Sequence, residues 1–372
     1  MEQLEPARPS ENYEHVDALR QAIADLFLVY DTTLDYPDKG YLRFRGRFLQ
    51  DPADCFPEMR RRFERHGFTP TVNEEGDRTA LIALPIVFEH SKSNRVINLV
   101  LFIATIFSTL FVGASYAAET PDQIWQLWRG WPFSASILLI LGAHELGHYF
   151  AARHHNVPVT LPYFLPMPLS LFGTLGAFIR LQGPVTNRRA LFDVGAAGPL
   201  AGLVFALPVL FIGLATSAVG PVMPGGIFEG NSILYSLAKL AVFGRLLPGN
   251  GVDVHLNQVA WAGWVGLFVT GLNLIPVGQL DGGHVAYALF GKRARLFFWP
   301  AIVALGLIVL YSWLAGFFTP TWLLWIFLLL AFGRVHARPL EDITELDPRR
   351  RVLAVFTLAL FFLAFVPFPL AG

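Results

Sequence analysis

Long uninterrupted apolar runs are the feature of this sequence that most constrains its fold. A helix needs roughly 20 residues to cross the hydrocarbon core of a bilayer. Hydrophobic residues make up 54% of the chain and charged residues only 15%, which favours a membrane protein over a soluble domain. We therefore predict a mainly α-helical polytopic membrane protein with six to seven transmembrane helices. The candidate spans are residues 96–118, 131–152, 190–214, 258–276, 296–317, 321–332 and 352–371.

Cationic residues between these runs predict the orientation, because Lys and Arg of short loops stay on the cytoplasmic side. They cluster after the second run and before the fifth and seventh runs. The opposite loops hold only Arg129, Lys239 and Arg245. The N-terminus is therefore predicted to be cytoplasmic. The clustered cations are Arg153, Arg180, Arg188, Arg189, Lys292, Arg293, Arg295, Arg334, Arg338, Arg349, Arg350 and Arg351.

The first ninety residues differ in character from the rest. The segment "YLRFRGRFL" alternates like a strand, "DPADCFPEMRRRFERHG" is bounded like a helix, and "TALIALPIVFE" is typical of another strand. We expect a small cytosolic α+β domain at residues 1–90, followed by a membrane-embedded domain at residues 91–372. The polar start of the chain predicts no cleavable signal peptide.

Cys55 is the single cysteine, so the sequence predicts neither a disulfide framework nor a thiolate metal cluster. The motif "HELGH" lies inside the second apolar run. On a helix, His144 and His148 share one face a turn apart and can bind one metal ion, while Glu145 is placed to accept a proton from water. A chance match is the alternative, but ionisable side chains at membrane depth are costly and rarely lack a purpose.

Two histidines leave a catalytic zinc ion short of one protein ligand. Asp281, just beyond the fourth run, supplies a carboxylate, and the predicted orientation brings it to the same half of the bilayer as His148. The alternative for Asp281 is a helix N-cap before "GGHVAYALF". The run "DVGAAGPLAG" contains Gly195, Gly198 and Gly202, which we interpret as a surface for close helix packing.

The two motifs, "HELGH" and the later "NLIPVGQLDGGH", together resemble the site-2 protease family of intramembrane zinc metalloproteases. The resemblance runs from about residue 96 to the C-terminus and favours the bacterial and plastid branch, although "QLDG" departs from the plastid "NPDG". The loop at residues 215–257 is too short for the PDZ domain of other members. A bacterial plasma membrane is the expected location.

The resemblance implies roles for the matching residues. His144, His148 and Asp281 would ligate one Zn²⁺ ion, Glu145 would be the general base, and Asn273 would hold or polarise the substrate carbonyl. A hydrogen bond to a neighbouring helix is an equal alternative for Asn273. The expected activity is hydrolysis of peptide bonds in or near transmembrane segments, which is regulated intramembrane proteolysis. The implied partners are a membrane-protein substrate and the lipid bilayer, with no nucleic acid, and the oligomeric state stays open.

The segment "LPYFLPMPLSLFGTLGAFIRLQG" is too broken for a span and too apolar for a free loop. We expect a re-entrant, β-like segment that lines a cavity at membrane depth. Residues 173–177 resemble a family strand on which an extended substrate could pair, and a re-entrant packing loop is the alternative.

Two other functions remain open at this stage. The chain could be a catalytically silent binding or chaperone module on the same scaffold, although none of the motif residues is replaced. It could also be a metal or proton transporter, because intramembrane His, Glu and Asp form ion pathways. The two halves show no repeat of the motif, which disfavours a transporter.

Overall fold

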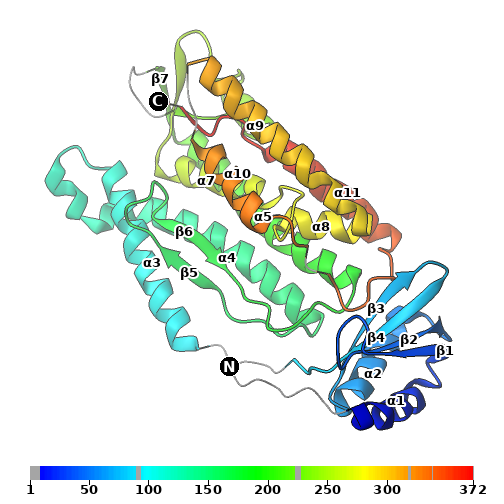
Figure 1. The fold of residues 1–372 in the computed structure, drawn as a ribbon. Helices are drawn as coiled ribbons and strands as arrows, with labels where there is room; N and C mark the ends of the chain where they lie inside the picture. The colour runs from blue at the N-terminus through cyan, green and yellow to red at the C-terminus, as the bar shows by residue number, and fades with distance from the viewer. Residues whose placement is uncertain (1–8, 89–93, 223–227, 317–319, 337, 372) are drawn as a thin grey trace.

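The computed structural model describes residues 9–88, 94–222, 228–316, 320–336 and 338–371. It consists of a helical bundle with a four-stranded sheet at one end (Figure 1). The sheet has the order β1-β2-β4-β3 and every pairing in it is antiparallel. Its strands and the two helices beside it are β1 (Phe27–Leu34), β2 (Leu42–Phe48), β3 (Thr69–Glu75), β4 (Arg78–Leu84), α1 (Pro9–Ile23) and α2 (Pro52–Arg65).

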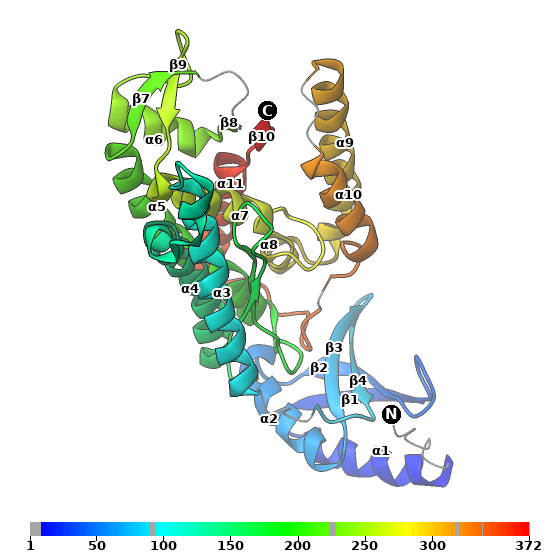
Figure 2. The same ribbon diagram turned by 90° about the vertical axis from the view of Figure 1, so that its left-hand side faces the viewer.

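This N-terminal sheet, with α1 and α2 on one side of it, has a hydrophobic core of its own (Figure 2). Phe27, Phe44, Met59 and Phe63 are almost completely buried there. The start of α2 is fixed by Asp51, whose side chain accepts a hydrogen bond from the backbone N–H of Ala53. The strands and helix expected from the sequence are present as β2, β4 and α2.

The segment that follows α10 (Thr321–Phe332) joins the sheet to the bundle. The backbone N–H of Val72 in β3 donates to the carbonyl of Leu340 at 2.7 Å, and the N–H of Asp342 donates to the carbonyl of Val72 at 3.1 Å. Leu340 itself is buried in the core of the sheet. Its neighbour Asp342 accepts from Nε of Arg188 at 2.8 Å and from the hydroxyl of Tyr287 at 2.7 Å.

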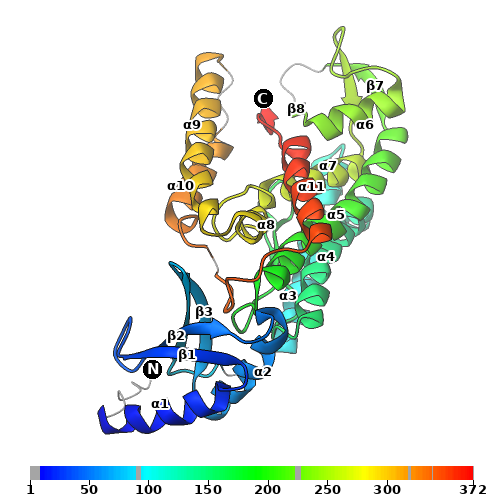
Figure 3. The same ribbon diagram turned by 90° about the vertical axis from the view of Figure 1, so that its right-hand side faces the viewer.

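Helices α4, α5 and α7 pack against one another at the centre of the bundle, and α8 and α11 cover them. Helices α9 and α10 lie side by side at one edge (Figure 3). The helices are α3 (Arg95–Tyr116), α4 (Trp131–His154), α5 (Arg188–Ala215), α6 (Ile233–Phe243), α7 (Gln258–Asn273), α8 (Asp281–Phe290), α9 (Phe298–Leu314) and α11 (Pro348–Ala364), with short 3-10 segments η1 (Pro121–Trp125), η2 (Leu127–Gly130) and η3 (Gly291–Phe297).

Three stretches of the described chain are long and apolar enough to cross a membrane: Arg95–Tyr116, Arg188–Ala215 and Asp281–Leu314. The third contains α8, η3 and α9, so the helix expected at 296–317 has an N-terminal extension that begins at Asp281. The last apolar run is not one helix. Helix α11 ends at Ala364, because Pro367 and Pro369 cannot continue it, and β10 (Leu370–Ala371) follows.

The segment between α5 and α7, interpreted above only as a loop, forms a small cap at the end of the bundle opposite the sheet. Two-stranded pairs form between β7 (Ala218–Pro221) and β9 (Val252–His255), and between β8 (Phe228–Glu229) and β10. Lys239 of α6 is fully buried in this cap, where its Nζ lies 3.2 Å from both Glu229 and Asp253.

The broken segment between α4 and α5 forms the antiparallel hairpin of β5 (Tyr163–Pro166) and β6 (Thr174–Phe178). Side chains at three positions along helix α3 donate hydrogen bonds to this segment. Asn98 donates to the carbonyls of Leu161 and Pro162, Ser108 donates to that of Gly173, and Tyr116 donates to that of Leu171. Polar side chains of α3, of which Asn98 and Ser108 are buried, thus satisfy backbone groups of the non-helical segment.

Candidate metal centre

The structure brings His144, His148 and Asp281 together inside the bundle. Both histidines are on α4, are at most 7% exposed and lie one turn apart, and Asp281 is the first residue of α8. One carboxylate oxygen of Asp281 lies 3.3 Å from Nε2 of each histidine, and the two Nε2 atoms are 3.1 Å apart. Three ligand atoms therefore converge within 4.8 Å.

Asp281 does not cap α8 with its side chain. The N-cap position is Leu280, and no side-chain hydrogen bond caps this helix. The carboxylate is turned towards the histidines instead. The N-cap alternative for Asp281 is therefore wrong.

The ring orientation of His148 is fixed from the other side. Its Nδ1 lies 2.7 Å from the carbonyl of Val194 on α5. Since a carbonyl only accepts hydrogen bonds, Nδ1 carries the proton and the lone pair of Nε2 is left to face His144 and Asp281. A backbone carbonyl in this position is the usual outer partner of a metal-binding histidine.

The glycines of α5 make room for the two imidazoles. A β-carbon at Gly198 would lie 2.0 Å from Nε2 of His148, and one at Gly202 would lie 3.2 Å from Cβ of His144. The glycine pattern was interpreted above as helix packing alone. The structure adds that Gly198 faces the site itself, a relation that the sequence could not reveal because it depends on which helix packs against α4.

Glu145 and Asn273 lie at the same place as the three ligand candidates. Both line a cavity of about 260 Å³ together with His144, His148 and Asp281, and Glu145 is only 5% exposed. Asn273 ends α7, and its Nδ2 lies 3.2 Å from Nε2 of His144. All five candidate site residues thus meet in one cavity.

Further residues of this cavity complete its walls. Ala177 and Phe178 of β6 lie on one side, and His284 of α8 lies on the other. His284 lies three residues after Asp281 in the sequence. The hairpin strand β6 therefore borders the cavity that contains Glu145.

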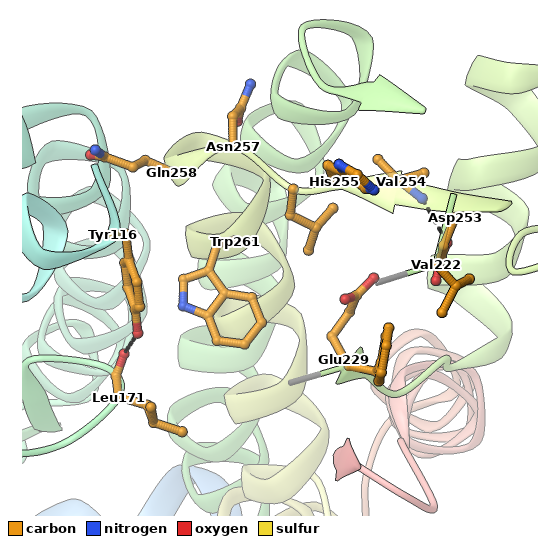
Figure 4. Close-up of a pocket in the computed structure, with 12 residues that line it drawn as sticks. Tyr116, Leu171, Val222, Glu229, Asp253, Val254, His255, Asn257, Gln258 and Trp261 are labelled. Carbon is orange, nitrogen blue, oxygen red and sulfur yellow. Dashed lines mark hydrogen bonds between the residues drawn. The ribbon is translucent and has the colours of Figure 1, made fainter. Parts of the chain in front are cut away.

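Two more cavities lie in the bundle. An apolar one of about 420 Å³ shares Asn273 with it and is lined by Phe268 of α7 and Trp325 of α10. The other, of about 540 Å³, lies beneath the cap and shares Leu171 with the apolar cavity. Figure 4 shows Tyr116, Trp261 and Glu229 around this cap cavity.

The chemistry of the donor set fits one divalent metal ion. Two imidazole nitrogens and a carboxylate oxygen suit zinc, and they leave a fourth position for water or substrate. The space that Gly198 and Gly202 leave beside the rings keeps the three donors from being pushed apart. A closely packed, buried donor set of this kind has no evident structural use in a membrane helix pair.

Comparison with known proteins agrees with this geometry. Residues 132–312 match Peptidase family M50, a segment that contains all five site residues. Residues 132–312 are therefore similar to this peptidase family. This match confirms the resemblance to the site-2 proteases inferred from the two motifs.

Curated relatives extend the similarity over almost the whole chain. A protein of Arabidopsis thaliana named probable zinc metalloprotease EGY2, chloroplastic, is 28% identical over 378 residues, which cover 96% of this chain and 66% of that protein. The Oryza sativa subsp. japonica protein of the same name is 27% identical over 372 residues, with 95% and 66% covered. Arabidopsis thaliana probable zinc metalloprotease EGY1, chloroplastic, is 30% identical over 300 residues, with 73% and 53% covered.

The chain spans 66% of the length of the first of these relatives. No solved structure matches it significantly. The relatives are named as chloroplastic proteins, so they do not support the bacterial plasma membrane expected above. An integral membrane protein agrees with the family and with the apolar helices.

Proposed function

We propose that this chain is an intramembrane zinc metalloendopeptidase that hydrolyses peptide bonds in or near transmembrane segments of membrane proteins. The observation that carries the proposal is the convergence of His144, His148 and Asp281 beside Glu145 in one buried cavity. The family match and the zinc metalloprotease names of the relatives support it.

In this proposal His144, His148 and Asp281 hold the zinc ion. When bound, zinc lowers the pKa of water and polarises a carbonyl group. Glu145 accepts the proton of the attacking water and delivers it to the departing amine nitrogen. The hydrogen bond from Nδ1 of His148 to the carbonyl of Val194 keeps the proton on Nδ1, so that Nε2 is free to bind metal.

Asn273 is proposed to orient the substrate carbonyl with its side-chain amide. Support comes from its position on the cavity wall, where its Nδ2 lies 3.2 Å from His144. The other interpretation, a hydrogen bond between helices α7 and α4, uses the same contact. A carbonyl-positioning role predicts that Asn273→Leu lowers cleavage while zinc content stays unchanged.

The substrate is proposed to lie extended against β6. This strand pairs on one side with β5, and it passes Glu145 where the cavity is lined by Ala177 and Phe178. Strand addition supplies backbone hydrogen bonds to a peptide and exposes its carbonyls. The apolar residues next to the cleaved bond would occupy the cavity lined by Phe268 and Trp325.

We also propose the finer organisation that the sequence predicts. Six to seven spans, a cytoplasmic N-terminus and a separate domain at residues 1–90 agree with the clustered cations and with the independent core of the N-terminal sheet. Leu340 would be the docking point of the membrane domain on that sheet. Protease digestion of the N-terminus in sealed vesicles of known orientation tests the topology.

The decisive experiment measures cleavage and bound zinc in the same samples. The full chain, purified in detergent, is incubated with a panel of model transmembrane peptides, with and without a chelator. Glu145→Gln is expected to bind zinc like the wild type and to lose about 10²–10⁴-fold in cleavage rate. Glu119→Gln, at an exposed position before α4, is the matched control and should leave both unchanged.

Three results would count against the proposal in different ways. Cleavage by Glu145→Gln at the wild-type rate would remove Glu145 from the reaction. Zinc bound without any cleavage of the panel would favour the binding or transport alternatives. If His144→Ala and Asp281→Ala both still bind zinc, the ligand set is wrong.

A further inference from the structure

Three exposed cations, Lys292, Arg293 and Arg295, lie within four positions of each other on η3. Segment η3 connects α8 to α9, and its cations directly precede the apolar run at residues 296–317. Within the part of the chain that the structure describes, none of the three forms an ion pair. Three like charges so close together repel one another unless an anion lies nearby.

Three arginines on the neighbouring helices form ion pairs. Arg188 donates to Asp342 at 2.8 Å, Arg350 contacts both Asp193 and Asp347 at 2.6 Å, and Arg351 contacts Glu345 at 2.8 Å. Arg188 lies close to η3, because a β-carbon at Gly291 would come within 2.8 Å of its guanidinium. The cations of η3 are thus set apart from those that stabilise the fold.

The surroundings of η3 are those of a membrane interface. Leu296 and Trp299, directly after the cations, are 72% and 58% exposed. The guanidinium of Arg334, just beyond α10, lies 5.5 Å from the ring of Trp299 and 5.7 Å from that of Phe298. Tryptophan beside cations is typical of the headgroup level of a bilayer. A fourth cation is therefore held at the same level as η3.

A small cavity of about 180 Å³ lies between η3 and the N-terminal sheet. Arg188, Lys292 and Arg293 line it, together with Glu74 and Asp342. The carboxylate of Asp342 already accepts hydrogen bonds from Arg188 and Tyr287. The volume is about six times the share of one water molecule in the liquid, roughly 30 Å³, so a group of phosphate size fits.

We propose that η3 and Arg334 bind the headgroups of anionic phospholipids. Charge complementarity and the exposed apolar residues of α9 favour a lipid, whose acyl chains would cover Leu296 and Trp299. The inference does not depend on the protease activity. Since η3 directly continues α8, which begins at Asp281, lipid bound here would also steady the helix that carries this carboxylate.

Trp299 provides a direct probe of this site. The full chain is reconstituted into phosphatidylcholine vesicles that contain a small, equal fraction of either brominated phosphatidylglycerol or brominated phosphatidylcholine, both of which quench tryptophan fluorescence. The difference between the wild type and Trp299→Phe isolates the emission of Trp299. Phosphatidylglycerol is expected to associate with Trp299 at least ten-fold more strongly than phosphatidylcholine, and less strongly at high salt.

Charge removal then tests the residues. Lys292→Gln, Arg293→Gln and Arg295→Gln combined should lower the preference to about the five-fold that Arg334 alone supplies, because each cation contributes about five-fold in affinity. The matched control combines Arg129→Gln and Arg245→Gln at the opposite end of the bundle and should keep the preference. Measurements of zinc content and thermal unfolding check that both proteins are folded. The single variant Arg293→Gln should lower the preference for phosphatidylglycerol by about five-fold.

Either of two outcomes would overturn the proposal. Equal quenching of Trp299 by the two lipids would mean that the cations carry no lipid preference. Displacement of phosphatidylglycerol by inorganic phosphate at an equal concentration would identify a site for small anions rather than for lipid.

Discussion

The N-terminal sheet and the central helices differ in how often their backbones approach each other at glycines. The sheet fills its interior with large side chains, among them Phe27, Phe44 and Phe63. The bundle also buries large side chains, among them Trp264 and Phe133, but its helices approach one another closely at glycines as well. A β-carbon at Gly213 would lie 2.2 Å from the backbone of Ala260, and one at Gly263 would lie 2.6 Å from Cα of Leu210.

The difference follows from the solvent of each region. In water, burial of apolar area drives folding, so large side chains are the best filling for a core. In lipid this drive is lost, and helices associate through close backbone contact, which small residues permit. The sheet should therefore be sensitive to the removal of atoms, and the bundle and its metal centre to their addition.

The largest expected effect is the removal of a side chain from the sheet. Phe63→Ala should lower the free energy of unfolding of the sheet by about 3–5 kcal/mol, because Phe63 is fully buried. Cys55, the single cysteine, lies in the same core and gives a local readout. Burial raises the pKa of its thiol to about 11, so labelling is slow while the sheet is folded.

The rate of Cys55 labelling should rise by about two to three orders of magnitude in Phe63→Ala. Leu49→Ala, at a position 48% exposed, is the control and should label like the wild type. Zinc binding is expected to stay unchanged in both variants. A parallel loss of zinc in Phe63→Ala would break the comparison, because it would show that the sheet and the bundle unfold together.

Addition of one methyl group tests the bundle. In Gly198→Ala the new Cβ would start 2.0 Å from Nε2 of His148, so the imidazole must shift from its position beside Asp281. We expect zinc affinity to fall by about 10–100-fold, the usual cost of disturbing a ligand through its surroundings. Competition with a chromophoric chelator measures the affinity.

Gly142→Ala is the matched control for this substitution. Gly142 lies on α4, as His148 does, but nothing is within 4 Å of the position that its β-carbon would take. Alanine also favours a helix over glycine. Zinc affinity should stay within two-fold of the wild type there, and an equal affinity in Gly198→Ala would contradict the role of close packing at the site.

The same contrast explains what the sequence could predict. Patterns that depend on neighbours in the chain were informative: the spacing of His144 and His148, the apolar runs that became α3, α4 and α5, and the strands β2 and β4. Asp281 could be paired with the histidines because the charged loops predict the direction of both helices. These inferences need no knowledge of which helices touch.

Features that depend on contacts between distant segments were missed. The pairing of β8 with β10 joins residues more than a hundred positions apart, and such short strands have no readable alternation. The bend at η3 and the approach of Gly198 to His148 are likewise set by neighbouring helices. Glycine in a sequence shows where close approach is possible, but not what approaches.

The smallest expected effect concerns charges on the surface of the sheet. Hydrogen bonds from Arg61 and Arg62 lower the pKa of Glu58 on α2 to about 2, from an ordinary value of 4.5. A carboxyl group whose pKa is lower in the folded state stabilises that state above its unfolded pKa. This contribution is present above about pH 4.5 and is lost as the pH falls towards 2.

Resistance of Cys55 to a pyridyl disulfide reagent, which also reacts at acidic pH, should therefore decline over that range. Glu58→Gln should make the decline less steep. The change in the slope of the unfolding free energy against pH should correspond to less than one bound proton, since Glu58 is exposed and screened by solvent. Asp77→Asn, which removes a carboxylate outside every ion pair in the described chain, should leave the slope unchanged. Equal slopes for Glu58→Gln and the wild type would mean that this ion pair does not stabilise the sheet, which would then depend on its apolar core alone.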